Sequence, residues 1–73
     1  MRAYMLITVQ GDARAIAEKI RALTGVKYAD AVSGGSTNVI AVVEADDAKA
    51  LDDAGMRMQE MTGVTSIETD FAL

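Results

Sequence analysis

The five residues from Gly34 to Asn38 have the composition of an anion-binding turn. Successive backbone amides in a glycine-rich turn can form a concave nest for an anion, and the hydroxyls of Ser36 and Thr37 add two donors. The same composition is typical of a plain connection between two strands of a hairpin. The residues alone therefore leave two interpretations open, a binding loop and a flexible turn.

Two pairs of adjacent carboxylates, Asp46-Asp47 and Asp52-Asp53, could be considered as ligands of a divalent cation. They fall at the start and in the first turns of a predicted helix, where negative side chains interact favourably with the helix dipole. We therefore expect these residues to serve the helix, and we predict neither a metal site nor a cofactor.

The chain is poor in catalytic groups. It contains no His, the commonest general base, and no Cys, so that neither a thiol nucleophile nor a thiolate metal site can form. We therefore do not expect an enzyme.

Size and charge restrict the function further. With 73 residues the chain forms one domain, residues 1–73, whose own core is marginal, and oligomerisation is a usual remedy. A formal net charge of −4 with scattered basic residues opposes direct nucleic-acid binding. The apolar stretch Tyr4 to Val9 is too short to span a membrane and lacks the pattern of a signal peptide, so we expect a cytoplasmic protein.

Hydrophobic periodicity divides the chain into six elements. We expect strands at Ala3–Gln10, Val26–Ser33, Val39–Glu44 and Thr65–Leu73, and helices at Ala13–Thr24 and from Asp46 or Asp47 to Gly63. The tetrapeptides LTGV and MTGV repeat the same helix end and strand start. This order predicts an α+β, ferredoxin-like βαββαβ fold in which two helices cover one face of a four-stranded antiparallel sheet, with strand order four, one, three, two.

The first and third strands are apolar on both sides, although two helices can cover only one face of the sheet. A second copy of the sheet is the simplest cover, so we expect a homodimer through the open sheet face. Tyr4 and Tyr28 suit such an interface because each has an apolar body and a polar end. Three methionines of the second helix, Met56, Met58 and Met61, are expected in the core or, alternatively, in an adaptable pocket wall.

Four segments resemble the effector-binding (RAM) domain of the Lrp/AsnC family of transcription regulators. They are AYMLITV, LTGVKYADAVSG, GSTNVIAVVEADD and MTGVTSIETDFAL, which together span most of the chain. In the family a loop of the form G-D-Y-D precedes an aliphatic strand that ends in V-E-A. Gly35 to Asn38 occupies that loop here, without the acidic and the aromatic residue usual in the family and with the glycine doubled by Gly34, so the identity of the effector stays open.

The resemblance implies dimers that associate into rings and bind small effectors, typically amino acids, between dimers. The implied ligand-binding residues are Gly34, Gly35, Ser36, Thr37, Asn38, Thr69 and Asp70. Asp70 is the candidate for the effector's ammonium. The family's DNA-binding helix-turn-helix does not precede the first strand, so we expect either a stand-alone domain that modulates a full-length Lrp/AsnC regulator of amino-acid metabolism or this domain cut from a longer chain.

Two other functions use a related fold. An ACT-like regulatory domain would bind its ligand at a helix-strand junction, away from Gly35. A dimeric ferredoxin-like barrel enzyme would need an enclosed cavity with an acid-base group, usually a His.

Overall fold

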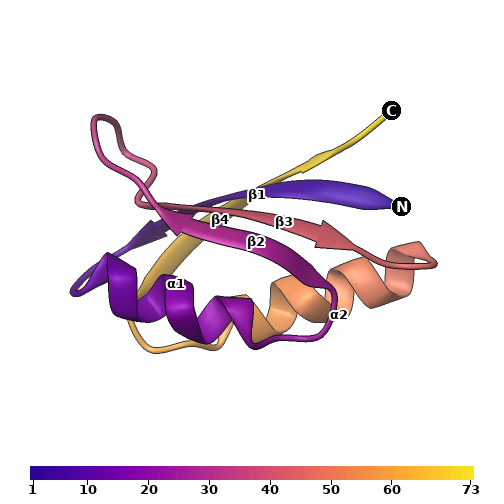
Figure 1. The fold of residues 1–73 in the computed structure, drawn as a ribbon, viewed down its shortest axis with the longest axis horizontal. Helices are drawn as coiled ribbons and strands as arrows, with labels where there is room; N and C mark the ends of the chain where they lie inside the picture. Colours follow the sequence, from indigo (N-terminus) through magenta and orange to yellow (C-terminus); the bar gives the residue numbers. More distant parts are fainter.

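The six elements follow the predicted order in the computed structural model, which describes all 73 residues. They are β1 (Arg2–Val9), α1 (Ala13–Arg21), β2 (Val26–Ala31), β3 (Val39–Glu44), α2 (Ala48–Gln59) and β4 (Val64–Phe71). The strands form one antiparallel sheet in the order β2-β3-β1-β4, and both helices lie on the same side of it (Figure 1). The predicted ferredoxin-like fold and strand order are confirmed.

The core lies between the sheet and the two helices. β1 buries every second residue from Ala3 to Val9, and β3 does the same from Val39 to Val43, because successive side chains of a strand point to opposite faces. The helices contribute apolar residues at helical spacing: Ile16, Ala17 and Ile20 from α1, and Leu51, Ala54 and Met58 from α2. No polar side chain is buried, so the core is held by apolar packing alone.

Each helix begins at an aspartate that caps its first turn. The Oδ1 atom of Asp12 accepts a hydrogen bond from the Ala15 amide (3.1 Å), and that of Asp47 accepts one from the Ala50 amide (2.9 Å). These carboxylates satisfy amides that have no partner within the helix. Of the two aspartates predicted to start α2, Asp47 is the cap. Neither helix has the length and apolar character that a membrane span requires.

The helices end a few residues before their predicted ends. The amides of Leu23 and Met61 donate to the carbonyls three residues earlier, Ile20 (3.0 Å) and Met58 (3.1 Å), which tightens the last turn and stops the α-helical pattern. β4 likewise ends at Phe71, two residues before the predicted Leu73, because the Ala72 amide makes its last bond to the Arg2 carbonyl (2.9 Å).

The repeated tetrapeptides form the same turn twice. Gly25 and Gly63 both have positive φ, +90° and +98°. Their carbonyls accept hydrogen bonds from the amides of Glu44 (2.8 Å) and Gln10 (2.7 Å), so each turn is tied to the end of a neighbouring strand. The internal repetition in the sequence thus corresponds to two equivalent helix-to-strand junctions.

Gly63 is the position where a side chain is least tolerable. An added Cβ would lie 2.8 Å from the Gln10 carbonyl oxygen and 2.9 Å from Ile16 Cδ1, in addition to the strain of positive φ. We expect Gly63→Ala to lower the free energy of unfolding by at least ~2 kcal/mol in urea denaturation.

Gly11→Ala is the matched control, because Gly11 also has positive φ but an added Cβ would have no atom within 4 Å of it. It should cost only about 1 kcal/mol. Equal losses for the two variants would show that the close approach at Gly63 contributes nothing.

Candidate functional site

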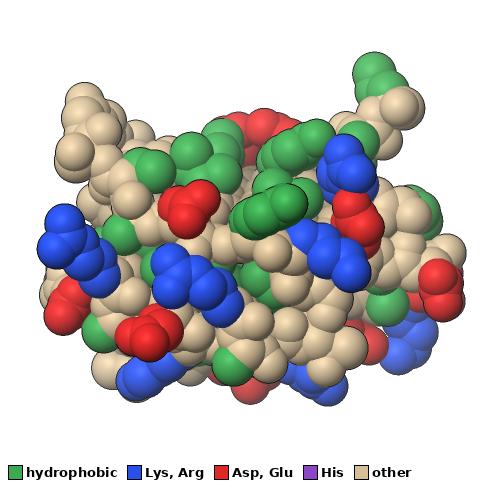
Figure 2. Space-filling view, viewed as in Figure 1, with side chains coloured by type: hydrophobic (Ala, Val, Ile, Leu, Met, Phe, Trp, Pro, Cys, Tyr) green, Lys and Arg blue, Asp and Glu red, His purple; other side chains and the backbone are tan.

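The sheet face opposite the helices carries a continuous apolar patch. Cross-strand pairing places Leu6 beside Ile40 and Tyr4 beside Val42, and Val42 also lies beside Tyr28 of β2. We call these five residues the open-face patch. The side chains of Tyr28, Tyr4 and Ile40 are 67%, 39% and 37% exposed, and Figure 2 shows hydrophobic side chains along the side of the sheet away from the helices. The predicted apolar character of both sheet faces is thus present in the fold.

Charged residues border the open-face patch. Glu68 and Asp70 of β4 lie opposite Leu6 and Tyr4. At the end of the central strands Arg2 donates to Glu44, with nitrogen-to-oxygen distances of 2.9 and 2.8 Å. Hydrogen bonding to Tyr4 and then to Glu44 raises the pKa of the Arg2 guanidinium, which therefore stays charged. The patch has the layout of an interface, with an apolar centre and a charged rim.

The predicted binding loop, residues 34–38, projects beyond the end of the sheet between β2 and β3 (Figure 1). Gly34 has φ +115°, a conformation that glycine adopts without strain. The Ser36 carbonyl accepts a hydrogen bond from the Thr8 hydroxyl (3.1 Å). Gly34 and Gly35 have no atom within 4 Å of a Cβ position, so the tip of the loop is open to its surroundings.

Asn38 anchors this loop to β1. Its side-chain Oδ1 accepts from the Val9 amide (2.8 Å), and its own amide donates to the Ile7 carbonyl (2.8 Å). The residue that the resemblance aligns here is an aspartate, which offers the same acceptor oxygen. The acceptor therefore has a structural use at this position in addition to any contact with a ligand.

Thr69 and Asp70 point to opposite faces of β4. Asp70 lies on the open face opposite Tyr4, whereas Thr69 lies opposite Met5, on the helix side of the sheet. There the Thr69 hydroxyl donates to Met5 Sδ (3.1 Å). Within one chain these two neighbours in the sequence cannot contact the same small ligand from the same side.

The loop and the end of β4 are also far apart along the sheet. Asn38 binds Val9, while Asp70 is paired with Tyr4, five residues away on the same strand. At about 3.3 Å per residue the two sites are roughly 16 Å apart. A single chain therefore does not bring all seven predicted ligand-binding residues together.

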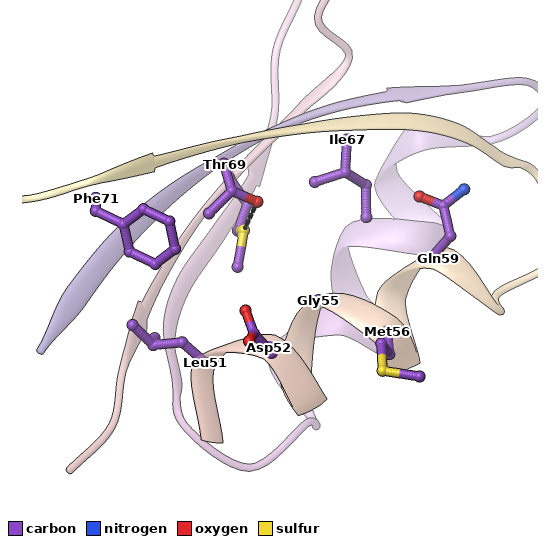
Figure 3. A pocket seen from close by; sticks show the side chains of 9 residues that line it. Leu51, Asp52, Gly55, Met56, Gln59, Ile67, Thr69 and Phe71 are labelled. Atoms are coloured by element: carbon purple, nitrogen blue, oxygen red, sulfur yellow. Dashed lines mark hydrogen bonds between the residues drawn. The ribbon is translucent and has the colours of Figure 1, made fainter. Parts of the chain in front are cut away.

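A groove of about 540 Å³ lies between α2 and the edge strand β4. Its lining residues come from three elements: Met5, Leu51, Asp52, Gly55, Met56, Gln59, Ile67, Thr69 and Phe71. In Figure 3 the Phe71 ring descends from β4 and the Asp52 carboxylate rises from α2 towards Thr69. The groove exists because β4 extends past the cover of α2, which leaves Phe71 half exposed although it faces the helix layer.

The sequence pointed to this groove only through Thr69 and Met56. Met56 lies at the groove, 61% exposed, whereas Met58 is fully buried and Met61 packs against the core. Met58 and Met61 thus have the predicted core position, and Met56 has the alternative position in a pocket wall. Asp52 and Gly55 were missed because their role depends on where α2 lies relative to β4, which hydrophobic periodicity does not encode.

The acidic pairs of the sequence separate in the structure. Asp47 caps α2, Asp52 lines the groove, and Asp53 pairs with Lys49 (3.2 Å) across one helical turn. No three carboxylates of the chain gather at one point.

Comparison with known proteins decides the family. Residues 2–73 match the family described as the Lrp/AsnC ligand binding domain. This chain belongs to that family. A search of curated proteins found no match. The predicted resemblance is confirmed, and this Lrp/AsnC domain is a regulatory-family domain.

Three solved structures have the same fold at about 30% identity. The protein TTHA0845 from Thermus thermophilus is 30% identical with a TM-score of 0.89, and the match covers 99% of this chain and 91% of that one. The hypothetical protein PHS023 from Pyrococcus horikoshii is 30% identical, with a TM-score of 0.87 and coverage of 99% and 88%. The protein FFRP-DM1 is 31% identical, with a TM-score of 0.85 and coverage of 99% and 97%.

Proposed function

We propose that this domain is a non-catalytic module that assembles through its sheet and binds a small-molecule effector, an amino acid or a related metabolite. In the cytoplasm it would modulate a full-length Lrp/AsnC regulator of amino-acid metabolism by joining its assembly. The observation that carries this proposal is the open-face patch, which no segment of the chain covers. Family membership supports the regulatory role.

A second copy is the natural cover for the patch. Hiding roughly 400 Å² of apolar surface at about 25 cal/mol per Å² contributes on the order of 10 kcal/mol before the costs of association. That is comparable with the whole stability of a small domain. In a twofold dimer the same patch serves both subunits, so one apolar face is sufficient.

An interface between subunits is also the place where the proposed effector site can be complete. Loop 34–38 and Asp70 lie roughly 16 Å apart in one chain, which is longer than any amino acid can span with its ammonium and carboxylate. A neighbouring subunit that brings its own loop close to Asp70 removes this difficulty. We therefore propose that the effector binds between subunits of a ring-like oligomer.

Ile40→Glu tests the sheet interface. A carboxylate at position 40, next to Leu6 in the open-face patch and opposite Asp30 of β2, would be buried beside a like charge on association, so we expect the mass from light scattering to fall towards the 7.7 kDa monomer. The circular dichroism of the variant should remain that of a folded protein, because Ile40 is exposed in the single chain.

Met56→Glu is the matched control. Met56 is more exposed than Ile40 but lies on the helix side of the molecule, so its replacement should leave the mass unchanged. A lower mass for Met56→Glu with no change for Ile40→Glu would place the interface on the helices and contradict the proposal.

Thermal unfolding with a panel of the twenty amino acids tests effector binding. Because a ligand that binds only the native assembly stabilises it, at least one amino acid should raise the melting temperature. Asp70→Asn should reduce that shift, since it removes the proposed partner of the ammonium. Glu68→Gln, the same charge change on the same face of β4, should retain the shift. Equal shifts for both variants would exclude Asp70 from the site.

A further inference from the structure

Gly55 is unexplained by the fold. It lies in the interior of α2, where glycine is the least favourable residue after proline, and it does not have positive φ. A Cβ at this position would meet only Met5 Cε, at 3.8 Å, an ordinary contact. Neither the backbone nor close packing therefore requires glycine here. Because Gly55 has no side chain, the α2 wall of the α2–β4 groove is open next to Met5.

The groove is apolar along its length and acidic at one point. Ile67 and Phe71 supply apolar surface from the sheet and Met56 supplies it from α2, while Met5 and Leu51, each 1% exposed, close the groove from beneath. Asp52 is the only charged lining residue, and no Lys or Arg lies among the nine. Its neighbour Asp53 is paired with Lys49, but Asp52 has no ion pair. The groove thus complements a cation that carries an apolar chain and opposes a carboxylate.

A second acceptor lies across from Asp52. The Thr69 hydroxyl donates its proton to Met5 Sδ (3.1 Å), which leaves the lone pairs of its oxygen free to accept. Figure 3 shows the Asp52 carboxylate directed from α2 towards this side chain on β4. An ammonium between the two elements would have one ionised and one neutral acceptor, and an attached chain could lie over Gly55 and Ile67 towards Gln59.

We propose that the α2–β4 groove is a binding site for apolar primary amines, in which Asp52 and Thr69 bind the ammonium and Gly55 sets the length of chain that fits. This site is distinct from the effector site proposed between subunits, because Asp70 and loop 34–38 lie outside the groove. Of the residues that the resemblance implied for the effector, Thr69 alone lines the groove, and we assign it to this site. An amino acid is disfavoured here, since its carboxylate would approach Asp52 with no cation to balance it.

Methyl NMR of the labelled methionines tests the proposal directly. Of the five methionines, Met5 and Met56 line the groove, while Met58 is buried in the core and serves as the internal reference. We expect n-butylamine and n-hexylamine to shift the Met5 and Met56 signals saturably, with n-hexylamine the tighter. n-Hexanol and hexanoate, which lack the positive charge, should bind at least roughly tenfold more weakly.

One matched pair of variants and one single variant separate the roles of the residues. Asp52→Asn should weaken n-hexylamine binding roughly tenfold, whereas Asp53→Asn, the same charge change one residue away, should not. Gly55→Ala should raise the melting temperature of the free protein, because alanine favours the helix, and yet weaken n-hexylamine binding several-fold more than n-butylamine binding.

Three results would overturn the proposal. The first is the absence of any saturable shift at Met5 with amines at millimolar concentration. The second is equal binding of n-hexanol and n-hexylamine. The third is a shift of the Met5 and Met56 signals with protein concentration alone, which would mean that another copy of the chain fills the groove. None of these three results depends on the thermal unfolding experiment with amino acids. The proposal for the groove and the proposal for the effector site are therefore tested independently.

Discussion

A four-stranded sheet with apolar central strands on both faces has only two helices to cover it. α1 and α2 bury one face completely enough that Met5, Ile7 and Val43 are inaccessible to water. The other face keeps Tyr4, Tyr28 and Ile40 in contact with solvent. Because burial of apolar surface is the main favourable term in folding, this imbalance is the reason for proposing that a second molecule covers the open face.

The incomplete coverage of the sheet by the two helices also explains the α2–β4 groove. β4 is an edge strand, and α2 lies against its first half more closely than against its end, so Thr69 and Phe71 face the helix layer without being buried. A larger residue at position 55 would narrow this gap, but the sequence has glycine there. Incomplete cover therefore leaves two different surfaces, a broad apolar face suited to a protein and a narrow groove suited to a small molecule.

Much of the fold could be predicted from the sequence, because its signals are local and periodic. Alternation along β1 and β3, the aspartate caps and the repeated glycine turns determine the element order and hence the strand order. The ends of the elements were less accurate, because i to i+3 bonds at Leu23 and Met61 replace the last helical turn. Such a tightening leaves no mark on hydrophobic spacing.

The site was predicted less completely than the fold. The separation of Thr69 and Asp70 onto opposite faces was already present in the alternation of β4, since neighbours in a strand always point apart. The anchoring of Asn38 on Val9 and the position of Asp52 across the groove from Thr69 depend on how segments far apart in the sequence pack together. One sequence without its folded structure contains no signal for contacts of that kind.

The central claim is that a second copy covers the open sheet face. Sedimentation equilibrium of the wild-type chain over a dilution series into the micromolar range tests it most directly. We expect a mass of at least twice 7.7 kDa at every concentration of the series. A folded 7.7 kDa monomer at micromolar concentration would contradict the account, because the sheet face would then be stable in water without a partner.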